Sequence, residues 1–343
     1  MKIRYAKFRI HLRHTFGISR GSNDWYDIAY IYIIDGNIIG RGEVAPSLRY
    51  NESIEKVLSI LNKGIELPKH QTDRGKIWES IKPQLFGIKC LEAAFSMALW
   101  DWWSQLNKVP LYEILNVSGE NLPLTSYTIS IGNLNEIAEK VDHARSCSIL
   151  KVKLGTPSLD KSIIKEIRNH TDKLIRVDAN EGWDLETAIE MTRWLDGQNV
   201  EFIEQPFPAN NLNQNIELKR KSPLDIIADE NSLSSKDIPN IKHYFDGINI
   251  KLMKCGSIEE AQEMIKIAKS YGLKIMLGCM VESSLGITAA AHLSSEVDYA
   301  DLDGNMLINN DPYEGIKIKN GQIVLNKKSG LGVTLKSNNK NLL

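Results

Sequence analysis

The chain has 343 residues, with 42 Lys and Arg against 43 Asp and Glu, so its formal net charge is −1. This length is enough for two domains with a large core, and the balanced charge gives no electrostatic reason to expect nucleic acid or an anionic membrane surface as a partner. No segment approaches about 18 uninterrupted apolar residues, and the first residues lack the apolar core of a signal peptide, so we expect a cytoplasmic protein that acts on a small molecule.

Residues 1–118 are predicted to form an α+β capping domain, with strands first and helices after them. Asp35 and Gly36 form a dipeptide that is a strong signal for a β-hairpin turn. Three segments beside this turn alternate polar and apolar side chains, as half-buried strands do. They are residues 3–12, 27–35 and 38–46.

A long helix is predicted at residues 91–107, and it contains Trp100, Trp102 and Trp103. An aromatic cluster of this kind can form a binding surface, but large aromatic side chains on a long helix more often fill a core. We therefore interpret the three tryptophans as packing of this helix against the neighbouring domain.

The four cysteines have no spacing typical of a metal site, and a reducing compartment disfavours disulfides. We interpret them as packing residues, with Cys279 expected near the active-site mouth. They are Cys90, Cys147, Cys255 and Cys279.

Residues 119–312 alternate eight short apolar runs with segments whose apolar residues recur at three- and four-residue spacing. The short runs predict strands buried on both faces, and the periodic segments predict helices. This alternation predicts an α/β fold, a modified TIM barrel of the (β/α)7β type. The eight runs are residues 123–132, 149–155, 173–183, 200–207, 224–230, 246–254, 271–280 and 297–304.

Five charged residues close five successive strands of this predicted barrel. The steps between them are 25, 26, 25 and 22 residues, about the length of one strand, one helix and two loops. Five unrelated surface charges would not keep this phase. A charge at the carboxyl end of a barrel strand lies where β/α barrels build their active sites. The five are Lys153, Asp178, Glu204, Asp229 and Lys251.

Asp178, Glu204 and Asp229 end three consecutive predicted strands and should lie side by side on the rim. Carboxylates crowded together need a cation, and a set of oxygen ligands with room for water and substrate suits Mg²⁺. The sequence therefore predicts a magnesium site.

Lys153 and Lys251 end the second and sixth predicted strands, which face each other across a ring of eight. Two opposed amines allow one to remove a proton and the other to return it to the opposite face of a carbon. The proton would lie α to a carboxylate, and the metal would stabilise the resulting enediolate. Lys151 shares a face of its strand with Lys153, so we assign Lys153 as the base and Lys151 as the residue that lowers its pKa.

The motifs KVK, DAN, EQP, ADE and NIK, behind an α+β capping domain, resemble the enolase superfamily in the branch of the muconate lactonizing enzymes. The likeness covers essentially the whole chain. It implies that Asp178, Glu204 and Asp229 hold Mg²⁺ and that Lys153 and Lys251 are the acid/base pair. Lys254, three residues further on, receives no catalytic role.

Asp301 and Asp303 end the eighth predicted strand on one face, and such a pair suits a substrate ammonium group. The alternative is two solvated loop acids or a helix cap. The pair resembles that of the dipeptide epimerases, where it holds the α-ammonium of the N-terminal residue. The segment 278–288, with Glu282, also resembles theirs, so Glu282 becomes a further candidate for substrate binding.

The side-chain specificity is expected to come from a lid loop near residues 15–25 of the capping domain. Arg20 in this loop matches the position at which L-Ala-D/L-Glu epimerases carry an arginine, and a guanidinium suits a carboxylate. Thr128, near the end of the first barrel strand, is a candidate hydrogen-bonding partner for the peptide. The resemblance thus favours epimerisation of the C-terminal residue of L-Ala-Glu.

Three other functions stay open on the sequence. An o-succinylbenzoate synthase or cycloisomerase on the same scaffold would need no ammonium site, and a non-catalytic binding barrel would not need both lysines and all three acids. An acid-sugar dehydratase would carry a histidine base late in the barrel. The histidine of the late barrel segments, His292, falls in a helical stretch and is interpreted as a packing or surface residue.

Residues 313–343 are predicted to form a further hairpin with a glycine-rich tail that returns to the capping domain. A homo-oligomer is compatible with the sequence, which does not define the number of subunits or the range of dipeptides accepted.

Overall fold

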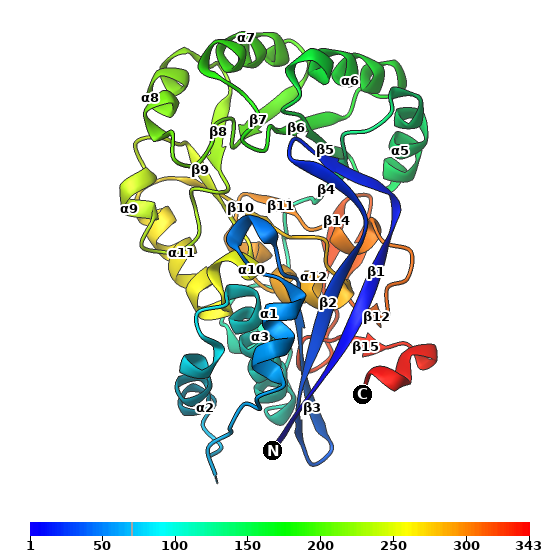
Figure 1. The fold of residues 1–343 in the computed structure, drawn as a ribbon, viewed down its shortest axis with the longest axis vertical. Helices are drawn as coiled ribbons and strands as arrows, with labels where there is room; N and C mark the ends of the chain where they lie inside the picture. Colours follow the sequence, from blue (N-terminus) through cyan, green and yellow to red (C-terminus); the bar gives the residue numbers. More distant parts are fainter. Residues whose placement is uncertain (70) are drawn as a thin grey trace.

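The computed structural model describes residues 1–69 and 71–343. Eight parallel strands form a barrel ringed by helices, and a three-stranded antiparallel sheet with its own helices lies against one side of it (Figure 1). The (β/α)7β barrel with an N-terminal α+β cap predicted from the sequence is confirmed.

The cap begins with the antiparallel sheet β1-β2-β3. The turn between β2 and β3 contains Gly36, whose φ of 58° lies in the left-handed region that glycine adopts without strain. Four helices follow the sheet in the chain. The elements are β1 (Lys2–Ile18), β2 (Gly21–Asp35), β3 (Ile38–Val44), α1 (Ile54–Leu61), α2 (Arg74–Ile81), α3 (Lys89–Leu106) and α4 (Leu111–Ile114).

Helix α3 is buried along most of its length between the cap sheet and the barrel helices. Gly42 on β3 allows this approach, because a Cβ there would collide with the backbone of Ala94 in α3. Trp102 is buried and donates from Nε1 to Asp35 Oδ2 at 3.2 Å, so it packs on the cap sheet. Trp100 instead stacks under Arg74, whose guanidinium lies 3.6 Å from the ring centroid. The tryptophans are therefore packing residues, and these contacts of Trp100 and Trp102 lie within the cap.

The eight barrel strands are hydrogen-bonded in chain order from β4 to β11. A parallel bridge between Thr125 and Ala300 brings the last strand beside the first and closes the ring. The strands are β4 (Ser126–Ile129), β5 (Ile149–Lys153), β6 (Leu174–Asp178), β7 (Val200–Glu204), β8 (Asp225–Ala228), β9 (Gly247–Ile250), β10 (Lys274–Gly278) and β11 (Tyr299–Asp301).

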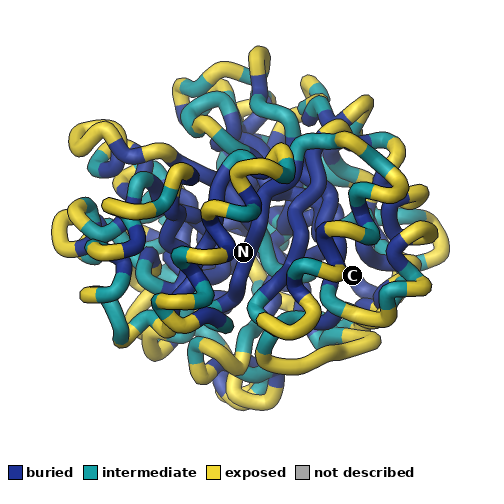
Figure 2. Tube along the Cα trace, turned by 90° about the horizontal axis from the view of Figure 1, so that it is seen from above, coloured by how far each residue is buried: buried dark blue, intermediate teal, exposed yellow. Residues whose placement is uncertain are grey.

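The barrel helices begin and end at the signals present in the sequence. Ser257 caps α11 by accepting from Glu260 N, and the chain leaves this helix through Gly272 at φ 68°. Buried segments occupy the middle of the molecule and exposed segments its rim (Figure 2). In the part of the chain that the structure describes, no helix is both long and apolar enough to cross a membrane. The helices are α5 (Ile137–His143), α6 (Pro157–His170), α7 (Leu185–Asp196), α8 (Leu212–Lys221), α9 (Ile238–Ile241), α10 (Leu252–Cys255), α11 (Ile258–Ser270) and α12 (Ser284–Ala291).

The segment near residues 15–25, which was predicted to be a lid loop, is mostly β-strand, so the prediction of a loop is wrong. β1 and β2 extend through this segment as one hairpin, with Ile18 paired to Gly21 and only Ser19 and Arg20 in the turn. The hairpin tip reaches the barrel, where Ser19 Oγ donates to Asn180 O at 2.7 Å. Tertiary contacts therefore extend β1 and β2 beyond the residues for which the local sequence pattern predicts strands.

The C-terminal segment divides between the barrel and the cap. Its hairpin covers the amino end of the barrel, where Thr125 N donates to Gly321 O at 2.8 Å. The tail then reaches the cap, where Arg4 Nη1 donates to Leu343 O at 3.0 Å. The predicted return to the cap thus applies to the tail and not to the hairpin. The strands are β12 (Tyr313–Glu314), β13 (Lys317–Lys319), β14 (Gln322–Val324) and β15 (Thr334–Leu335).

Candidate active site

Strand register brings three carboxylates together at the carboxyl end of the barrel. Lys153 on β5 is paired with Asp178 on β6, and Asp178 with Glu204 on β7, while Asp229 follows β8 directly. One ligand oxygen from each of the three acids lies within 4.8 Å of the others. All three side chains are buried. A compact set of oxygen ligands from rigid strand ends fits the magnesium ion predicted from the sequence.

Nearby lysines lower the pKa of two of these three carboxyl groups, whereas the pKa of the third is raised. Burial alone would raise the pKa of the Asp178 carboxyl, but Lys153, with Nζ 2.6 Å from Asp178 Oδ2, and Lys151 lower it. Lys251, with Nζ 2.7 Å from Asp229 Oδ2, lowers the pKa of Asp229 in the same way. Burial and the Asp178 carboxylate raise the pKa of Glu204 to about 7. A divalent cation between the three acids would add to the positive charge that Lys151 places 2.6 Å from Glu204 Oε2.

Lys153 and Lys251 both line a cavity of about 550 Å³ at the barrel mouth. They belong to strand ends four positions apart in the ring, β5 and β9, with the acidic trio on the strands between them. Burial lowers the pKa of Lys251, but the Asp229, Glu204 and Asp178 carboxylates together outweigh it and the net shift is upward. The opposed arrangement predicted for the two amines is therefore present.

Lys151 lies beneath this cavity in a nest of carboxylates. Its Nζ is 2.6 Å from Glu204 Oε2, 2.7 Å from Asp301 Oδ2 and 3.4 Å from Asp178 Oδ2. Burial opposes the charge of Lys151, yet these acids raise its pKa well above the ordinary value. Lys151 therefore stays an ammonium, and it shares the Asp178 Oδ2 atom with Lys153.

Asp301 and Asp303 both line the cavity but have different surroundings. Asp301 accepts from Lys151 Nζ and from Ser126 Oγ. Burial would raise its pKa, but the charges of Lys151 and Lys153 and these hydrogen bonds together lower it to about 2. Asp303 accepts from the backbone N–H of Thr128, and burial and the Asp301 charge raise its pKa to about 7. Asp303 is thus the member of the pair that has no cation beside it among the described residues. The Thr128 side chain lines the same cavity.

Arg20 reaches the cavity from the hairpin tip with its guanidinium already paired. Its Nη1 donates to Asn180 O at 2.8 Å and lies 2.9 Å from Glu181 Oε2, while Nη2 lies 2.9 Å from Glu230 Oε1. Arg49 also pairs with Glu181, at 2.7 Å. These contacts hold the hairpin tip over the mouth through loops that follow β6 and β8.

Three other candidates occupy different places. Glu282 is buried, accepts from Met280 N at 2.7 Å, and does not line the cavity among the described residues, so the structure gives it no direct route to a ligand there. Cys279 does line the cavity, as expected. His292 is buried with its Nε2 3.1 Å from Leu331 O and stacks on Tyr112, which confirms it as a packing residue.

Several residues that position the site were missed by the sequence analysis. Lys254 is buried and its Nζ donates to Asp229 O at 2.7 Å and Asn249 O at 2.9 Å. Asn249 Nδ2 donates to Glu204 Oε1 at 2.7 Å, and Gln205 Oε1 accepts from Asp229 N at 2.9 Å. Asn249 and Gln205 belong to the NIK and EQP motifs. Their positions next to predicted site residues in these motifs could have identified them from the sequence. Lys254 was placed in the mouth region from its position after Lys251, but its hydrogen bonds to Asp229 and Asn249 depend on the tertiary fold.

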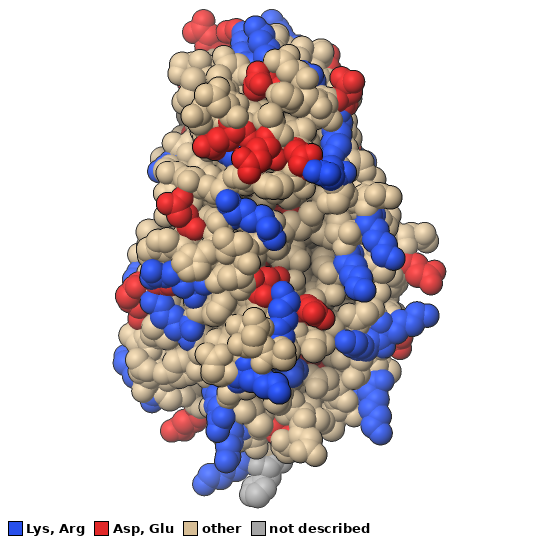
Figure 3. Space-filling model, turned by 90° about the vertical axis from the view of Figure 1, so that its right-hand side faces the viewer, with Lys and Arg blue, Asp and Glu red and all other residues tan. Residues whose placement is uncertain are grey.

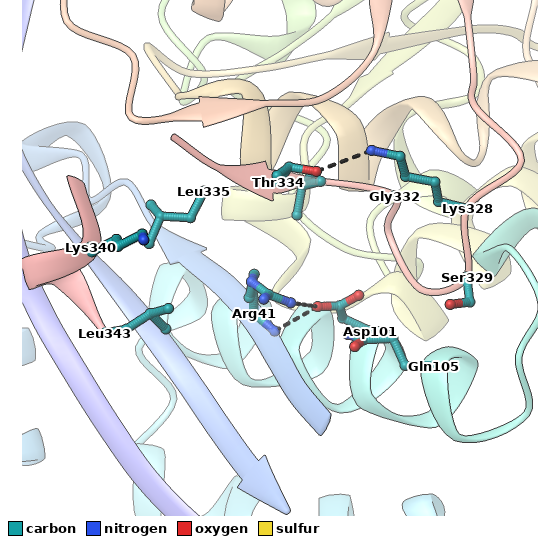
Figure 4. Close-up of a pocket in the computed structure, with 11 residues that line it drawn as sticks. Arg41, Asp101, Gln105, Lys328, Ser329, Gly332, Thr334, Leu335, Lys340 and Leu343 are labelled. Carbon is teal, nitrogen blue, oxygen red and sulfur yellow. Dashed lines mark hydrogen bonds and ion pairs between the residues drawn. The ribbon is translucent and has the colours of Figure 1, made fainter. Parts of the chain in front are cut away.

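A second cavity, of about 510 Å³, lies between β3, α3 and the C-terminal segment (Figure 4). Within it Arg41 Nη1 is 3.5 Å from Asp101 Oδ2, and Lys328 Nζ donates to Thr334 Oγ1 at 3.2 Å. Asp101 also accepts from Leu331 N at 2.8 Å. These contacts tie the tail to the cap, and none of the residues predicted for the active site takes part.

Comparison with known proteins gives consistent results. A sequence profile described as Enolase C-terminal domain-like matches residues 134–339. The chain is 36% identical over 342 residues to the L-Ala-D/L-amino acid epimerase of Flavobacterium johnsoniae, covering 98% of this chain and 100% of that protein. It is 37% identical over 339 residues to the L-Ala-D/L-Glu epimerase of Bacteroides thetaiotaomicron, covering 97% and 88%.

Solved structures agree over almost the whole fold. The substrate-liganded L-Ala-D/L-Glu epimerase from Bacillus subtilis superposes with a TM-score of 0.90 at 28% identity, covering 97% of this chain and 98% of that one. The dipeptide epimerase from Cytophaga hutchinsonii, complexed with Mg and the dipeptide D-Ala-L-Val, superposes with a TM-score of 0.90 at 27% identity, covering 99% and 96%.

Proposed function

Because the chain belongs to the enolase C-terminal domain-like family, we propose that it is a Mg²⁺-dependent dipeptide epimerase. The reaction inverts the α carbon of the C-terminal residue of a dipeptide. One observation carries this proposal: two lysines on opposed strand ends flank a buried trio of carboxylates at the mouth of one cavity. A proton can be removed from one side of a bound carbon and returned on the other only where two such groups face it.

In this mechanism Lys153 and Lys251 exchange roles according to the epimer that is bound. One amine removes the α-proton and the other ammonium delivers a proton to the opposite face. Asp178, Glu204 and Asp229 would hold Mg²⁺, which would supply positive charge beside the substrate carboxylate. Lys151 stays charged beside Asp178, the carboxylate that also accepts from Lys153 Nζ.

The far wall of the cavity supplies the site for the substrate ammonium. Asp303 has free acceptor capacity, whereas Asp301 is committed to Lys151 and Ser126. We infer that Asp303 is the main partner of the ammonium and that Asp301 contributes its charge from behind. Thr128, whose N–H holds Asp303, places that carboxylate on the wall.

We propose L-Ala-Glu as the preferred substrate, with Arg20 as the partner of the glutamate side chain. Arg20 lines the cavity opposite the aspartate wall, and a guanidinium holds a carboxylate through parallel N–H bonds. Glu181 and Glu230 accept from those donors. A substrate carboxylate would therefore replace one of two carboxylates that already surround Arg20.

The direct experiment is ¹H NMR of L-Ala-L-Glu with the protein and Mg²⁺ in D₂O, with L-Ala-L-Ala and L-Ala-L-Phe in parallel. Loss of the C-terminal α-proton signal together with growth of the diastereomer establishes the epimerase. Exchange in the other dipeptides but not in Ala-Glu keeps the chemistry and rejects the role of Arg20. No exchange in any dipeptide rejects the proposed function.

Arg20→Ala tests the substrate choice separately. KM for Ala-Glu should rise far more than KM for Ala-Ala or Ala-Phe, because only the first substrate carries a side-chain carboxylate. An equal rise for all three would show that Arg20 acts only by holding the hairpin through Glu181 and Glu230. Glu181→Gln is the matched control, since it loosens that contact and leaves the guanidinium in place.

An o-succinylbenzoate synthase or cycloisomerase is the alternative on this scaffold. Such an enzyme has no substrate ammonium to bind, so Asp303→Asn would leave its activity largely intact. The buried pair Asp301 and Asp303 on the cavity wall favours the epimerase, because carboxylates there would attract a substrate ammonium and repel an anionic substrate.

A further inference from the structure

Three potential metal ligands lie together outside the active site. They are His14 on β1 and Glu139 and His143 on α5, and one ligand atom of each lies within 4.8 Å of the others. His14 Nε2 and His143 Nδ1 are 2.8 Å apart. His14 is half-buried and the other two are exposed, so an ion from solution can reach them.

The backbone of both elements favours this meeting. Glu139 and His143 are four residues apart on α5 and so share one face of that helix. The pairing of β1 with β2 shifts register between His11 and Phe16, and His14 falls inside this irregular stretch. A strand side chain released from regular pairing can turn toward α5, as the contact with His143 shows.

The spacing fits ligation after a small adjustment. Two imidazole nitrogens bound tetrahedrally to Zn²⁺ at about 2.0–2.1 Å are about 3.3 Å apart. The observed 2.8 Å separation is that of a hydrogen bond between the two rings, so they need to open by only about 0.5 Å. Exposed side chains can make such a change by small rotations.

The charges around the rings also favour a cation. Glu139 on α5 and Glu136, directly before this helix, contribute negative charge near His14, and Lys140 on α5 is an opposing positive group. Lys140 Nζ lies 3.3 Å from Glu136 Oε2, which compensates its charge. Burial is the main factor that lowers the pKa of His14, and a neutral imidazole is the form that binds metals. The face of the molecule that carries β1 and α5 also shows a group of acidic side chains in its upper part (Figure 3).

We propose that His14, Glu139 and His143 form a second metal site, for a transition-metal dication of the Zn²⁺ class. Two imidazoles and one carboxylate with a water as fourth ligand suit Zn²⁺, whereas Mg²⁺ prefers oxygen ligands alone. The site is distinct from the Asp178, Glu204 and Asp229 trio in position and in ligand chemistry.

The site would fix the cap hairpin to the barrel. His14 lies two residues before Phe16, which lines the active-site cavity. Next along β1, Gly17 O accepts from Ile131 N at 2.9 Å, which is the existing contact of the hairpin with the end of β4. A metal that joins β1 to α5 adds a stronger tie beside this contact and restrains the lid from the side opposite Arg20.

The test is titration of Zn²⁺ into Mg²⁺-saturated protein by isothermal calorimetry, comparing wild type with His14→Ala and His143→Ala. His170→Ala is the matched control, because His170 pairs with Glu166 on α6 in the same i, i+4 arrangement but has no third ligand beside it among residues 1–69 and 71–343. Removing a residue that hydrogen-bonds to a metal ligand typically lowers metal affinity about 10- to 100-fold. Removing a ligand itself should therefore weaken Zn²⁺ binding by more than about 100-fold.

Wild type and His170→Ala should bind one more equivalent of Zn²⁺ than the His14 and His143 variants. The visible spectrum of the Co²⁺-substituted protein should lose its tetrahedral bands in the same two variants. Equal stoichiometry and affinity in all four proteins would refute the site and would place any Zn²⁺ at the acidic trio. His14→Gln and His143→Gln, checked by circular dichroism, separate loss of ligation from misfolding. The epimerase reaction is not the readout, so the two proposals fail independently.

Discussion

Replacing Asp303 by asparagine removes one negative charge from the cavity wall and leaves the local backbone contacts in place. The asparagine side chain would keep an oxygen acceptor for the N–H of Thr128, which alanine would not. Asp301 and its partners Lys151 and Ser126 are not altered. The substitution therefore tests a charge and not a shape.

The expected effect follows from the surroundings of Asp303. A hydrogen bond to a charged group contributes about 1.5–3 kcal/mol, so kcat/KM for L-Ala-L-Glu should fall about 10- to 150-fold, mainly through KM. Burial and the Asp301 charge raise the pKa of Asp303 to about 7, so the charged form costs free energy above that pH. The variant should then be no less stable than wild type at pH 8, where this cost is present in full.

The assay compares L-Ala-L-Glu with N-propionyl-L-glutamate, which has the same length but no ammonium group. The variant should lose affinity for the dipeptide and not for the propionyl compound. In wild type, KM for Ala-Glu should rise as pH falls below about 7, because protonated Asp303 no longer attracts the ammonium, and Asp303→Asn should lack this rise. Equal losses with both substrates, or an unchanged pH profile in the variant, would refute the assignment.

Three further results are expected. Lys153→Ala and Lys251→Ala should each lower the epimerisation rate about 10²–10⁴-fold. Each variant should also abolish exchange of the α-proton in D₂O from one epimer only. Loss of exchange from both epimers in either variant would contradict the division of roles between the two lysines. Removal of Mg²⁺ by EDTA should end the reaction. Mg²⁺ at 100 times its Kd should raise the free energy of unfolding, measured in urea, by about 2.7 kcal/mol. An unchanged free energy of unfolding would argue against Mg²⁺ binding to the three carboxylates of the folded protein. Gly42→Ala should lower the free energy of unfolding by about 1–3 kcal/mol, because the added Cβ meets the backbone of Ala94 on α3, and an unchanged urea midpoint would show that the two elements can separate without cost.

The sequence alone predicts the barrel because its signals are local and repeated. Each strand is a short apolar run, each helix has its own periodicity and cap, and the phase of about 25 residues counts the strands. The step from Lys153 to Lys251 in that count already places the two lysines on opposite sides of a ring of eight. Strand register then brings Asp178 beside Glu204, as the same count requires.

Only the tertiary structure decides the parts that depend on contacts between distant segments. No local pattern shows that residues 15–25 continue as a hairpin, that Glu282 is turned away from the cavity, or that Lys254 holds Asp229. Their conformations depend on the packing of the cap on the barrel and on the loop geometry. The residues at strand ends can thus be predicted from the sequence, because their spacing and their residue types indicate their place and chemistry. The conformation of the hairpin tip and of the residues that support the site depends on long-range contacts, which produce no periodic pattern in the sequence.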